Sequence, residues 1–396
     1  MSRDFDLVIF GATGFTGRLV AEYVATRAST AKTRWAIAGR NQAKLEALGF
    51  GVPVLVGDAL DRAAMDAIAK RTKVVCTTAG PYAKFGLPLA SACAAAGTHY
   101  CDLTGEVPFM RRSIDANETT ARATGARIVH TCGFDSIPSD LGTYLAQHEF
   151  AKRFGRPASL VTAMYGEQSG GFSGGTVASA MNIADEAAKD RDVRRLLANP
   201  YALDPDPTAS HAPSPDETSI GWKADMKMFT VPFVMAQVNA RVVRRAHALA
   251  GFPYGVDFRY REVMSTPGTA RGLAMALGIF GGVAGIAIAM KKPRLRAMLA
   301  KRAPQPGEGP SAAARAKGHW KVRVVAESGA DRLVYIMADA DGDPGYASTA
   351  KMLGESALCL AHDKLASKGG VQTPSIAMGD ALAARLRAAG LTLAPA

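Results

Sequence analysis

The sequence predicts an α/β protein that combines a doubly wound parallel sheet with a second α+β domain built on a mixed sheet. Two observations predict this class. Short β-branched runs alternate with helical stretches over about the first 135 residues, and longer strands of alternating polarity follow Pro138. At 396 residues the chain has room for two or three domains, so we expect a first domain at residues 1–140 and a second at residues 141–375.

In the first domain, six β-branched runs are expected to form the strands. They are Asp6–Phe10, Arg34–Arg40, Pro53–Asp58, Lys73–Gly80, Thr98–Leu103 and Ala126–Gly133. Helical stretches such as GRLVAEYVATRA and DRAAMDAIAKR lie between most of these runs. This alternation predicts a parallel sheet with helices on both faces.

The second domain is expected to contain four longer strands and three helices. The strands are Ser159–Glu167, Asp257–Thr266, Lys321–Ser328 and Arg332–Ala340, and the helices are Gly175–Arg191, Val231–Leu249 and Tyr346–Leu365. Five prolines between residues 199 and 220 predict a surface loop or lid. A last helix, residues 376–390, could pack back on the first domain.

A glycine-rich turn, VIFGATGFTGRLV, joins the first strand to the first helix. In a dinucleotide-binding Rossmann turn, the three glycines permit a tight turn, a close approach to the pyrophosphate and close helix packing. We therefore predict a dinucleotide site here; an ordinary glycine-rich turn is the alternative. The residues expected to contact the dinucleotide are Gly11, Thr13, Gly14, Phe15, Thr16 and Gly17.

The end of the second predicted strand indicates which dinucleotide is bound. An NAD site generally ends this strand with an acidic residue, whereas here Gly39 and Arg40 follow, with Lys44 one helical turn later. A guanidinium can bind a 2′-phosphate with two hydrogen bonds, so we predict NADP(H); the alternative for Arg40 is a surface cation. Asp58 is expected near the adenine, and Gly80 and Pro81 near the nicotinamide.

The segment GLAMALGIFGGVAGIAIAM, residues 272–290, has no charged residue, and a basic stretch follows it. Residues 291–323 hold ten Lys and Arg against one Glu, which accounts for nine of the net charge of +12. This pattern favours a membrane surface, contacted through residues 272–302, over nucleic acid. A full span is disfavoured because it would separate strands of one sheet; burial in the core or in a homodimer contact, and a solvated basic loop, are the alternatives.

Other composition signals place the chain in the cytoplasm, peripheral to the membrane. The five cysteines show no CxxC spacing and predict reduced thiols. The first strand begins within about five residues, which leaves no room for a signal peptide. The seven histidines show neither HExxH nor a close pair, so no metal site is expected.

Several motifs together resemble the saccharopine dehydrogenase-like oxidoreductases, in the branch that includes the trans-acting enoyl reductases of glycolipid synthesis. These motifs are GATGFTG, AGRN, AGPY, YCDLTGE, GFDSIPSDLG, SGGT and GDPGYASTAKMLGESALCLA, and they cover nearly the whole chain. The resemblance implies an NADP-type Rossmann domain, a second α+β domain and a lipid-related role. Outside residues 291–323 the second domain is neutral, which is unlike a site for a tri-acid such as saccharopine.

Candidate catalytic residues follow the predicted strands, where doubly wound folds gather their ligands. Tyr82 could donate a proton or pack beside the nicotinamide, and Asp102, Glu106 and Asp135 could act as acids and bases or cap helices and close turns. We take Tyr82, Asp102 and Asp135 as the catalytic candidates.

We thus expect an NADPH-dependent oxidoreductase, and in particular an enoyl reductase that acts on a lipid or on a carrier-bound acyl chain in glycolipid biosynthesis. One alternative is an imine or saccharopine-type amino-acid dehydrogenase. Another is a non-catalytic NADP(H)-binding protein of a membrane surface.

Overall fold

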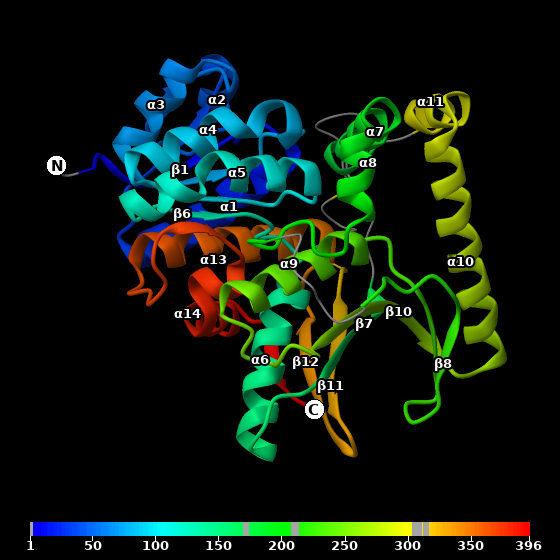
Figure 1. The fold of residues 1–396 in the computed structure, drawn as a ribbon. Coiled ribbons are helices and arrows are strands. Elements are labelled where there is room, and N and C mark those ends of the chain that lie inside the picture. The colour runs from blue at the N-terminus through cyan, green and yellow to red at the C-terminus, as the bar shows by residue number, and fades with distance from the viewer. Residues whose placement is uncertain (1–2, 169–173, 207–213, 303–310, 312–316) are drawn as a thin grey trace.

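The computed structural model describes residues 3–168, 174–206, 214–302, 311 and 317–396, and it contains two seven-stranded sheets (Figure 1). The first sheet is wholly parallel and the second is mixed, so the predicted fold class is confirmed. Parts of the proline-rich loop and of the basic flank, residues 207–213, 303–310 and 312–316, lie outside the described residues.

The first sheet has the strand order β13-β6-β5-β4-β1-β2-β3. Its strands are β1 (Phe5–Phe10), β2 (Trp35–Gly39), β3 (Val54–Val56), β4 (Thr72–Thr77), β5 (His99–Asp102), β6 (Arg127–Val129) and β13 (Gly370–Gln372). The first six coincide with the predicted runs. The seventh was missed, because a three-residue strand is too short to show a periodic pattern.

Helices cover both faces of this sheet. They include α1 (Phe15–Ala31), α2 (Gln42–Glu46), α3 (Arg62–Arg71), α4 (Tyr82–Ala96), α5 (Val107–Thr124) and α13 (Thr349–His362). Helix α13 packs against α1 and against β1, β4 and β5. The helix predicted at Tyr346–Leu365 therefore covers the first sheet, although the sequence assigned it to the second domain; it is preceded by the π-helix η1 (Pro344–Ser348).

The second sheet has the strand order β14-β12-β11-β7-β10-β9-β8. Its strands are β7 (Leu160–Gln168), β8 (Gly221–Lys223), β9 (Met228–Pro232), β10 (Arg259–Pro267), β11 (Trp320–Ser328), β12 (Asp331–Asp339) and β14 (Thr392–Pro395). The four predicted strands are β7, β10, β11 and β12. The helix predicted at Val231–Leu249 begins later, as α9 (Ala236–Leu249), because Val231 and Pro232 belong to β9.

Helix α6 (Ile137–Phe154) connects the two sheets: it follows β6 of the first sheet and packs against β11 and β12 of the second. Helix α14 (Pro374–Ala388) packs on α13 and α6. Helices α7 (Gly174–Lys189) and α8 (Arg191–Ala198) lie beside the first domain and lead into the proline-rich loop.

The prediction that residues 199–220 form a surface loop is wrong for part of the segment. Ala202, Leu203 and Asp204 are at most 2% exposed. Three buried arginines of α9 hold this segment through its backbone carbonyls: Arg241 binds the Asn199 carbonyl, Arg244 that of Pro200, and Arg245 that of Leu203. Prolines signalled irregular backbone correctly, but irregular backbone can be buried once its carbonyls have donors.

Helix α10 (Ala270–Lys291) contains the apolar segment and lies at the edge of the molecule (Figure 1). In the described chain it is the one helix long and apolar enough to cross a membrane, and only 6% of its apolar window is buried. Its start packs on β9 and β10, and helix α11 (Pro293–Arg302) ties its end to α7. Strands β7 and β10, before α10, and β11, after it, lie in one sheet.

Candidate active site

The glycine turn between β1 and α1 leaves no room for side chains. A Cβ atom on Gly17 would lie 2.1 Å from the Gly11 carbonyl oxygen and 2.6 Å from Thr78 Oγ1. Gly11 has a φ of +88°, which favours glycine, and a Cβ there would lie 3.0 Å from the backbone nitrogen of Ala79. Gly14 and Thr13 are exposed at the mouth of the turn. The backbone is thus open to an anionic diphosphate at the start of α1, where the helix dipole favours negative charge.

An aromatic contact links this turn to η1. The rings of Phe15 and Tyr346 meet edge to face, with their centroids 5.0 Å apart. Thr349, at the start of α13, donates from its hydroxyl to the Pro344 carbonyl and accepts the backbone N–H of Phe134 at 3.1 Å. The glycine turn, η1 and the loop after β6 therefore meet at one edge of the sheet.

The outer rim of the turn is basic. Arg40 and Lys44 are exposed at the end of β2, where Asn41 caps α2 by accepting the backbone N–H of Lys44 at 2.9 Å. Asp58 is also exposed, and its carboxylate accepts the backbone N–H of Leu60. This arrangement fits a nucleotide that carries a 2′-phosphate, with the glycine turn holding the diphosphate.

Tyr82 begins α4 directly after the exposed Gly80 and the half-buried Pro81. Its side chain is buried, its ring stacks on Phe109, and its hydroxyl donates to the Thr77 carbonyl at 3.0 Å. Burial raises the pKa of Tyr82 well above its usual value. This geometry favours the packing interpretation of Tyr82 over proton donation.

Glu106 caps helix α4 from outside that helix. Its carboxylate accepts the backbone N–H groups of Tyr82 and Ala83 at 2.9 and 2.8 Å. Ser179 of α7 donates a third hydrogen bond at 2.7 Å. The capping interpretation of Glu106 is therefore confirmed by its contacts.

Asp102, at the end of β5, is fully buried and accepts four hydrogen bonds. Tyr100 Oη lies 2.9 Å and His130 Nδ1 2.7 Å from its Oδ2, and the backbone N–H groups of Thr104 and Thr131 donate to Oδ1. His130 Nε2 in turn lies 2.9 Å from Ser113 Oγ. This Ser-His-Asp order resembles a hydrolytic triad, but Ser113 lies inside a helix and has no exposed surface. The contacts give Asp102 a structural role.

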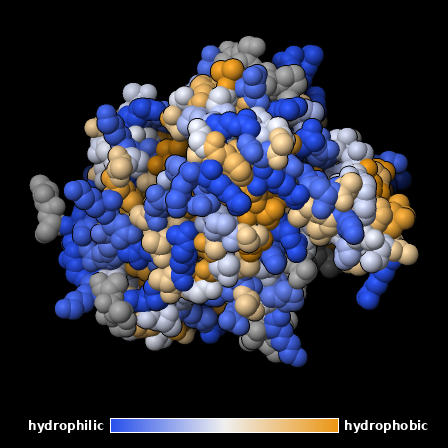
Figure 2. Space-filling view, turned by 90° about the horizontal axis from the view of Figure 1, so that it is seen from below, coloured by the Kyte–Doolittle hydropathy of each residue, from blue (hydrophilic) through white to orange (hydrophobic). Residues whose placement is uncertain are grey.

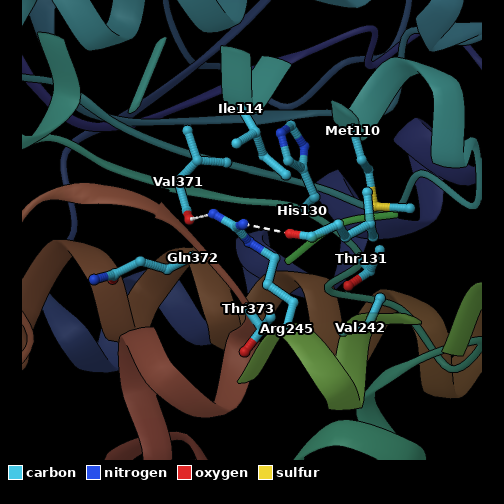
Figure 3. A pocket seen from close by; sticks show the side chains of 10 residues that line it. Met110, Ile114, His130, Thr131, Val242, Arg245, Val371, Gln372 and Thr373 are labelled. Carbon is cyan, nitrogen blue, oxygen red and sulfur yellow. Dashed lines mark hydrogen bonds between the residues drawn. The ribbon is translucent and has the colours of Figure 1, made fainter. Parts of the chain in front are cut away.

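Beside His130 lies a small cavity between the first sheet and α9 (Figure 3). Arg245 fills one side of it and donates to the carbonyls of Leu203 and Val371 at 2.5 and 2.6 Å. Apolar side chains such as Met110 and Ile114 line the other side. The cavity holds little more than a water molecule and is not a substrate site.

Asp135 lies in the loop between β6 and α6 and is half-buried. The capping interpretation is wrong for this residue: the cap position of α6 is Ser136, and among the described residues none donates a hydrogen bond to the Asp135 carboxyl. Burial raises the pKa of Asp135 to about 6. Of the three catalytic candidates, Tyr82 and Asp102 are buried and Asp135 is partly exposed, so the Asp135 carboxyl is the group most accessible to a substrate.

A buried polar cluster, which the sequence did not predict, lies against the Asp135 loop. Its centre is Glu262 of β10, which is 2% exposed. The other members are Ser136, Ser139, Tyr165, Asn239 and Tyr260. These residues are dispersed over more than one hundred positions, and the one available signal was a glutamate at an inward position of the alternating strand Phe258, Tyr260, Glu262.

Comparison with known proteins agrees with this geometry. Residues 7–129 match the family model of the saccharopine dehydrogenase NADP binding domain. A Mycobacterium tuberculosis protein whose name provisionally assigns it as a trans-acting enoyl reductase is 44% identical over 99% of this chain and 97% of its own length. The trans-acting enoyl reductase of Mycobacterium bovis is 39% identical over 99% of this chain and 97% of its own.

The fold has a solved counterpart. Saccharopine dehydrogenase (L-Glu forming) from Saccharomyces cerevisiae superimposes with a TM-score of 0.55 at 14% identity, covering 98% of this chain and 99% of that one. With the glycine turn and the basic rim, the match to the NADP binding domain model identifies the cofactor of this chain as NADP(H). The chain belongs to the saccharopine dehydrogenase-like family of NADP(H)-dependent oxidoreductases, together with the trans-acting enoyl reductases.

Proposed function

We propose that this oxidoreductase reduces a carbon–carbon double bond conjugated to a carbonyl, on a lipid or on a carrier-bound acyl chain of glycolipid biosynthesis. The observation that carries the proposal is the full-length similarity to trans-acting enoyl reductases, at 39–44% identity. A second observation supports it: a half-buried acid, Asp135, lies at the same sheet edge as the dinucleotide turn.

The nicotinamide, when bound, supplies the hydride for the β carbon of the acyl chain. The chain's own residues must then supply a proton for the α carbon of the resulting enolate. Asp135 is suited to this role, because burial keeps part of its carboxyl protonated near neutral pH. The hydroxyl of Tyr82 and the carboxylate of Asp102 are held by other groups.

The experiment measures NADPH oxidation with α,β-unsaturated acyl thioesters of increasing chain length. Asp135→Asn is expected to lower kcat by about 10²- to 10⁴-fold with little change in NADPH affinity. Asp140→Asn is the matched control, since Asp140 is buried in the first turn of α6, just after the Asp135 loop, but binds Ser375. Reduction of NADP⁺ with saccharopine, or oxidation of NADPH with an imine, together with no oxidation of NADPH by any of the thioesters, would support the amino-acid dehydrogenase alternative instead.

Arg40 is proposed to select NADPH over NADH. Its guanidinium is exposed beside the glycine turn, with Lys44 nearby and no acidic residue on the end of β2. Arg40→Ala should weaken NADPH binding by about tenfold or more and leave NADH binding nearly unchanged, as measured by fluorescence titration. An unchanged affinity ratio would contradict the assignment.

We also propose that the protein is a cytoplasmic one that binds membrane surfaces through α10 and α11. The exposed apolar side chains of α10 include Leu273, Leu277 and Ile286, and Lys292 and Arg294 follow them. Both ends of α10 are attached to the same body, which supports a helix lying along a leaflet rather than crossing it. A homodimer contact through α10 is the competing proposal.

A further inference from the structure

Three consecutive apolar residues, Phe233, Val234 and Met235, connect β9 to α9. Phe233 and Met235 are half-buried, whereas Val234 is 50% exposed. This 233–235 segment therefore presents apolar surface that the described residues leave partly uncovered.

The 233–235 segment lies between the two domains. On one side, the methyl carbon of Met235 lies 3.3 Å from the position that a Cβ atom would take on Gly105, in the loop after β5. On the other side, the ring of Phe233 stacks on Tyr165 of β7, with the centroids 4.4 Å apart. The segment is thus in contact with a loop of the first domain and with a strand of the second.

The Met235 end of the segment lies beside the edge where the nicotinamide is expected. Gly105 directly precedes Glu106, whose carboxylate accepts the backbone N–H groups of the first two residues of α4. Helix α4 begins directly after Pro81, which is expected near the nicotinamide. Loops at the carboxyl ends of parallel strands gather the ligands of a doubly wound fold, so Met235 contacts a loop of the ligand-binding edge.

The Phe233 end of the segment lies beside the Asp135 loop. Tyr165 packs edge to face on Phe134, with the centroids 5.8 Å apart. Ser136 Oγ donates to Asn239 Oδ1 of α9 at 2.7 Å. Both chain neighbours of Asp135 are therefore attached to the elements that hold the segment.

We infer that the 233–235 segment is one wall of the substrate site, and that Val234 contacts the acyl chain beside the double bond that is reduced. The segment runs from the edge expected to hold the nicotinamide to the loop that carries the proposed proton donor. Its side chains carry no charge, which suits an acyl chain and not the carboxylates of a tri-acid. The inference rests on the proposed enoyl reduction and names the part of the second domain that binds the substrate.

Calorimetry of thioester binding tests the inference without turnover. The probes are the octanoyl and dodecanoyl thioesters of N-acetylcysteamine, which are saturated and carry no nucleotide that could occupy the glycine turn. Val234→Asp should weaken the binding of both by about tenfold or more, because a carboxylate would replace apolar surface in contact with the chain. Val234→Ala should weaken it by about three- to tenfold, through the loss of two methyl groups. The affinity for NADPH should not change in either variant.

Val256→Asp is the matched control, since Val256 is 77% exposed in the loop at the opposite end of α9 and should change neither affinity. The inference would be overturned by a wild type that binds neither thioester, or by unchanged thioester affinity in both Val234 variants. A wild type that binds the saturated thioesters, with the expected loss in Val234→Asp, but oxidises no NADPH with the unsaturated ones would overturn only the proposed reaction.

Chemical labelling tests where the bound chain lies. All five native cysteines are buried, so the thiol introduced by Val234→Cys should react with a maleimide much faster than they do. The ligand is the amide analogue of the dodecanoyl thioester, which cannot transfer its acyl group to the thiol. At about ten times its Kd, labelling should slow about tenfold, because only about a tenth of the protein stays free. Labelling of Val256→Cys should not slow, and equal labelling of Val234→Cys with and without the bound amide would overturn the inference.

Discussion

Helices α9 and α10 reverse the usual relation between polarity and burial. Helix α9 carries three arginines, Arg241, Arg244 and Arg245, that are 2–4% exposed. Helix α10 has no charged residue between Gly272 and Met290, yet Leu277, Ile286 and Ile288 are 54–55% exposed. Figure 2 shows the apolar side chains gathered on the projection that α10 forms, at the right of the molecule.

The difference shows that a helix is buried according to the partners available, rather than by its composition alone. The arginines of α9 can be buried because irregular backbone offers them carbonyl acceptors at 2.5 to 3.0 Å. Helix α10 has no comparable partner among the described residues, and its glycines Gly278, Gly281, Gly282 and Gly285 face open space. An exposed apolar surface of this kind is typical of an interaction site, and a membrane surface is the partner that we propose for it.

The largest expected effect tests the buried half of the comparison. Arg245→Ala should lower the free energy of unfolding by roughly 3 to 5 kcal/mol, because two buried carbonyls lose their donor at about 1 to 3 kcal/mol each and a cavity is left. Urea denaturation measures it. Arg259→Ala, at an exposed position, is the control, with a change of about 0.5 kcal/mol or less. An equal change in the free energy of unfolding in both variants would mean that the buried hydrogen bonds of Arg245 do not stabilise the fold.

A charge placed on one face of α10 tests the exposed half. At 3.6 residues per turn, Leu277 and Ile288 share one face, and Met275 and Ile286 share the opposite one. One double variant is Leu277→Glu with Ile288→Glu, and the other is Met275→Glu with Ile286→Glu. For a helix lying on a membrane, only one of these two variants should lose liposome binding, by about 10²-fold, with the free energy of unfolding in solution nearly unchanged. Loss in both variants would indicate immersion or a span, and loss in neither would contradict membrane binding.

The basic residues after α10 should contribute less. Lys292→Gln with Arg294→Gln removes two exposed cations and should weaken binding to anionic vesicles by about 2 kcal/mol, on an estimate of about 1 kcal/mol for each cation. Binding to vesicles of neutral lipid is the control and should not change. Equal weakening on both vesicle types would point to an altered structure instead of lost head-group contacts.

The smallest effect separates the membrane proposal from a homodimer. Gly281→Ala with Gly285→Ala should stabilise a lipid-facing or solvent-facing α10 by about 0.5 to 1 kcal/mol per residue, since no atom lies within 4 Å of either added Cβ. A dimer packed through this glycine spacing would instead be weakened. Analytical ultracentrifugation and thermal unfolding of the double variant distinguish the two outcomes.

The sequence by itself determined the elements that depend on local patterns. The glycine turn of residues 11–17 has a local cause, because only glycine fits the positive φ of Gly11 and the 2.1 Å approach at Gly17. The strands of the first sheet and the apolar character of residues 272–290 follow from periodicity and composition in the same way.

The tertiary structure alone decided the rest, because it depends on contacts between distant residues. It placed α13 on the first sheet and η1 beside α1 and α13. It also buried Ala202–Asp204 under arginines some forty positions away, and brought Glu262 to Ser139 from more than a hundred positions away. It also distinguished three acidic residues that look alike in the sequence. The carboxylates of Asp102 and Glu106 accept hydrogen bonds from named donors, whereas that of Asp135 accepts none from the described residues. A carboxyl's chemistry is set by burial and partners, and neither of these is a local property of the chain.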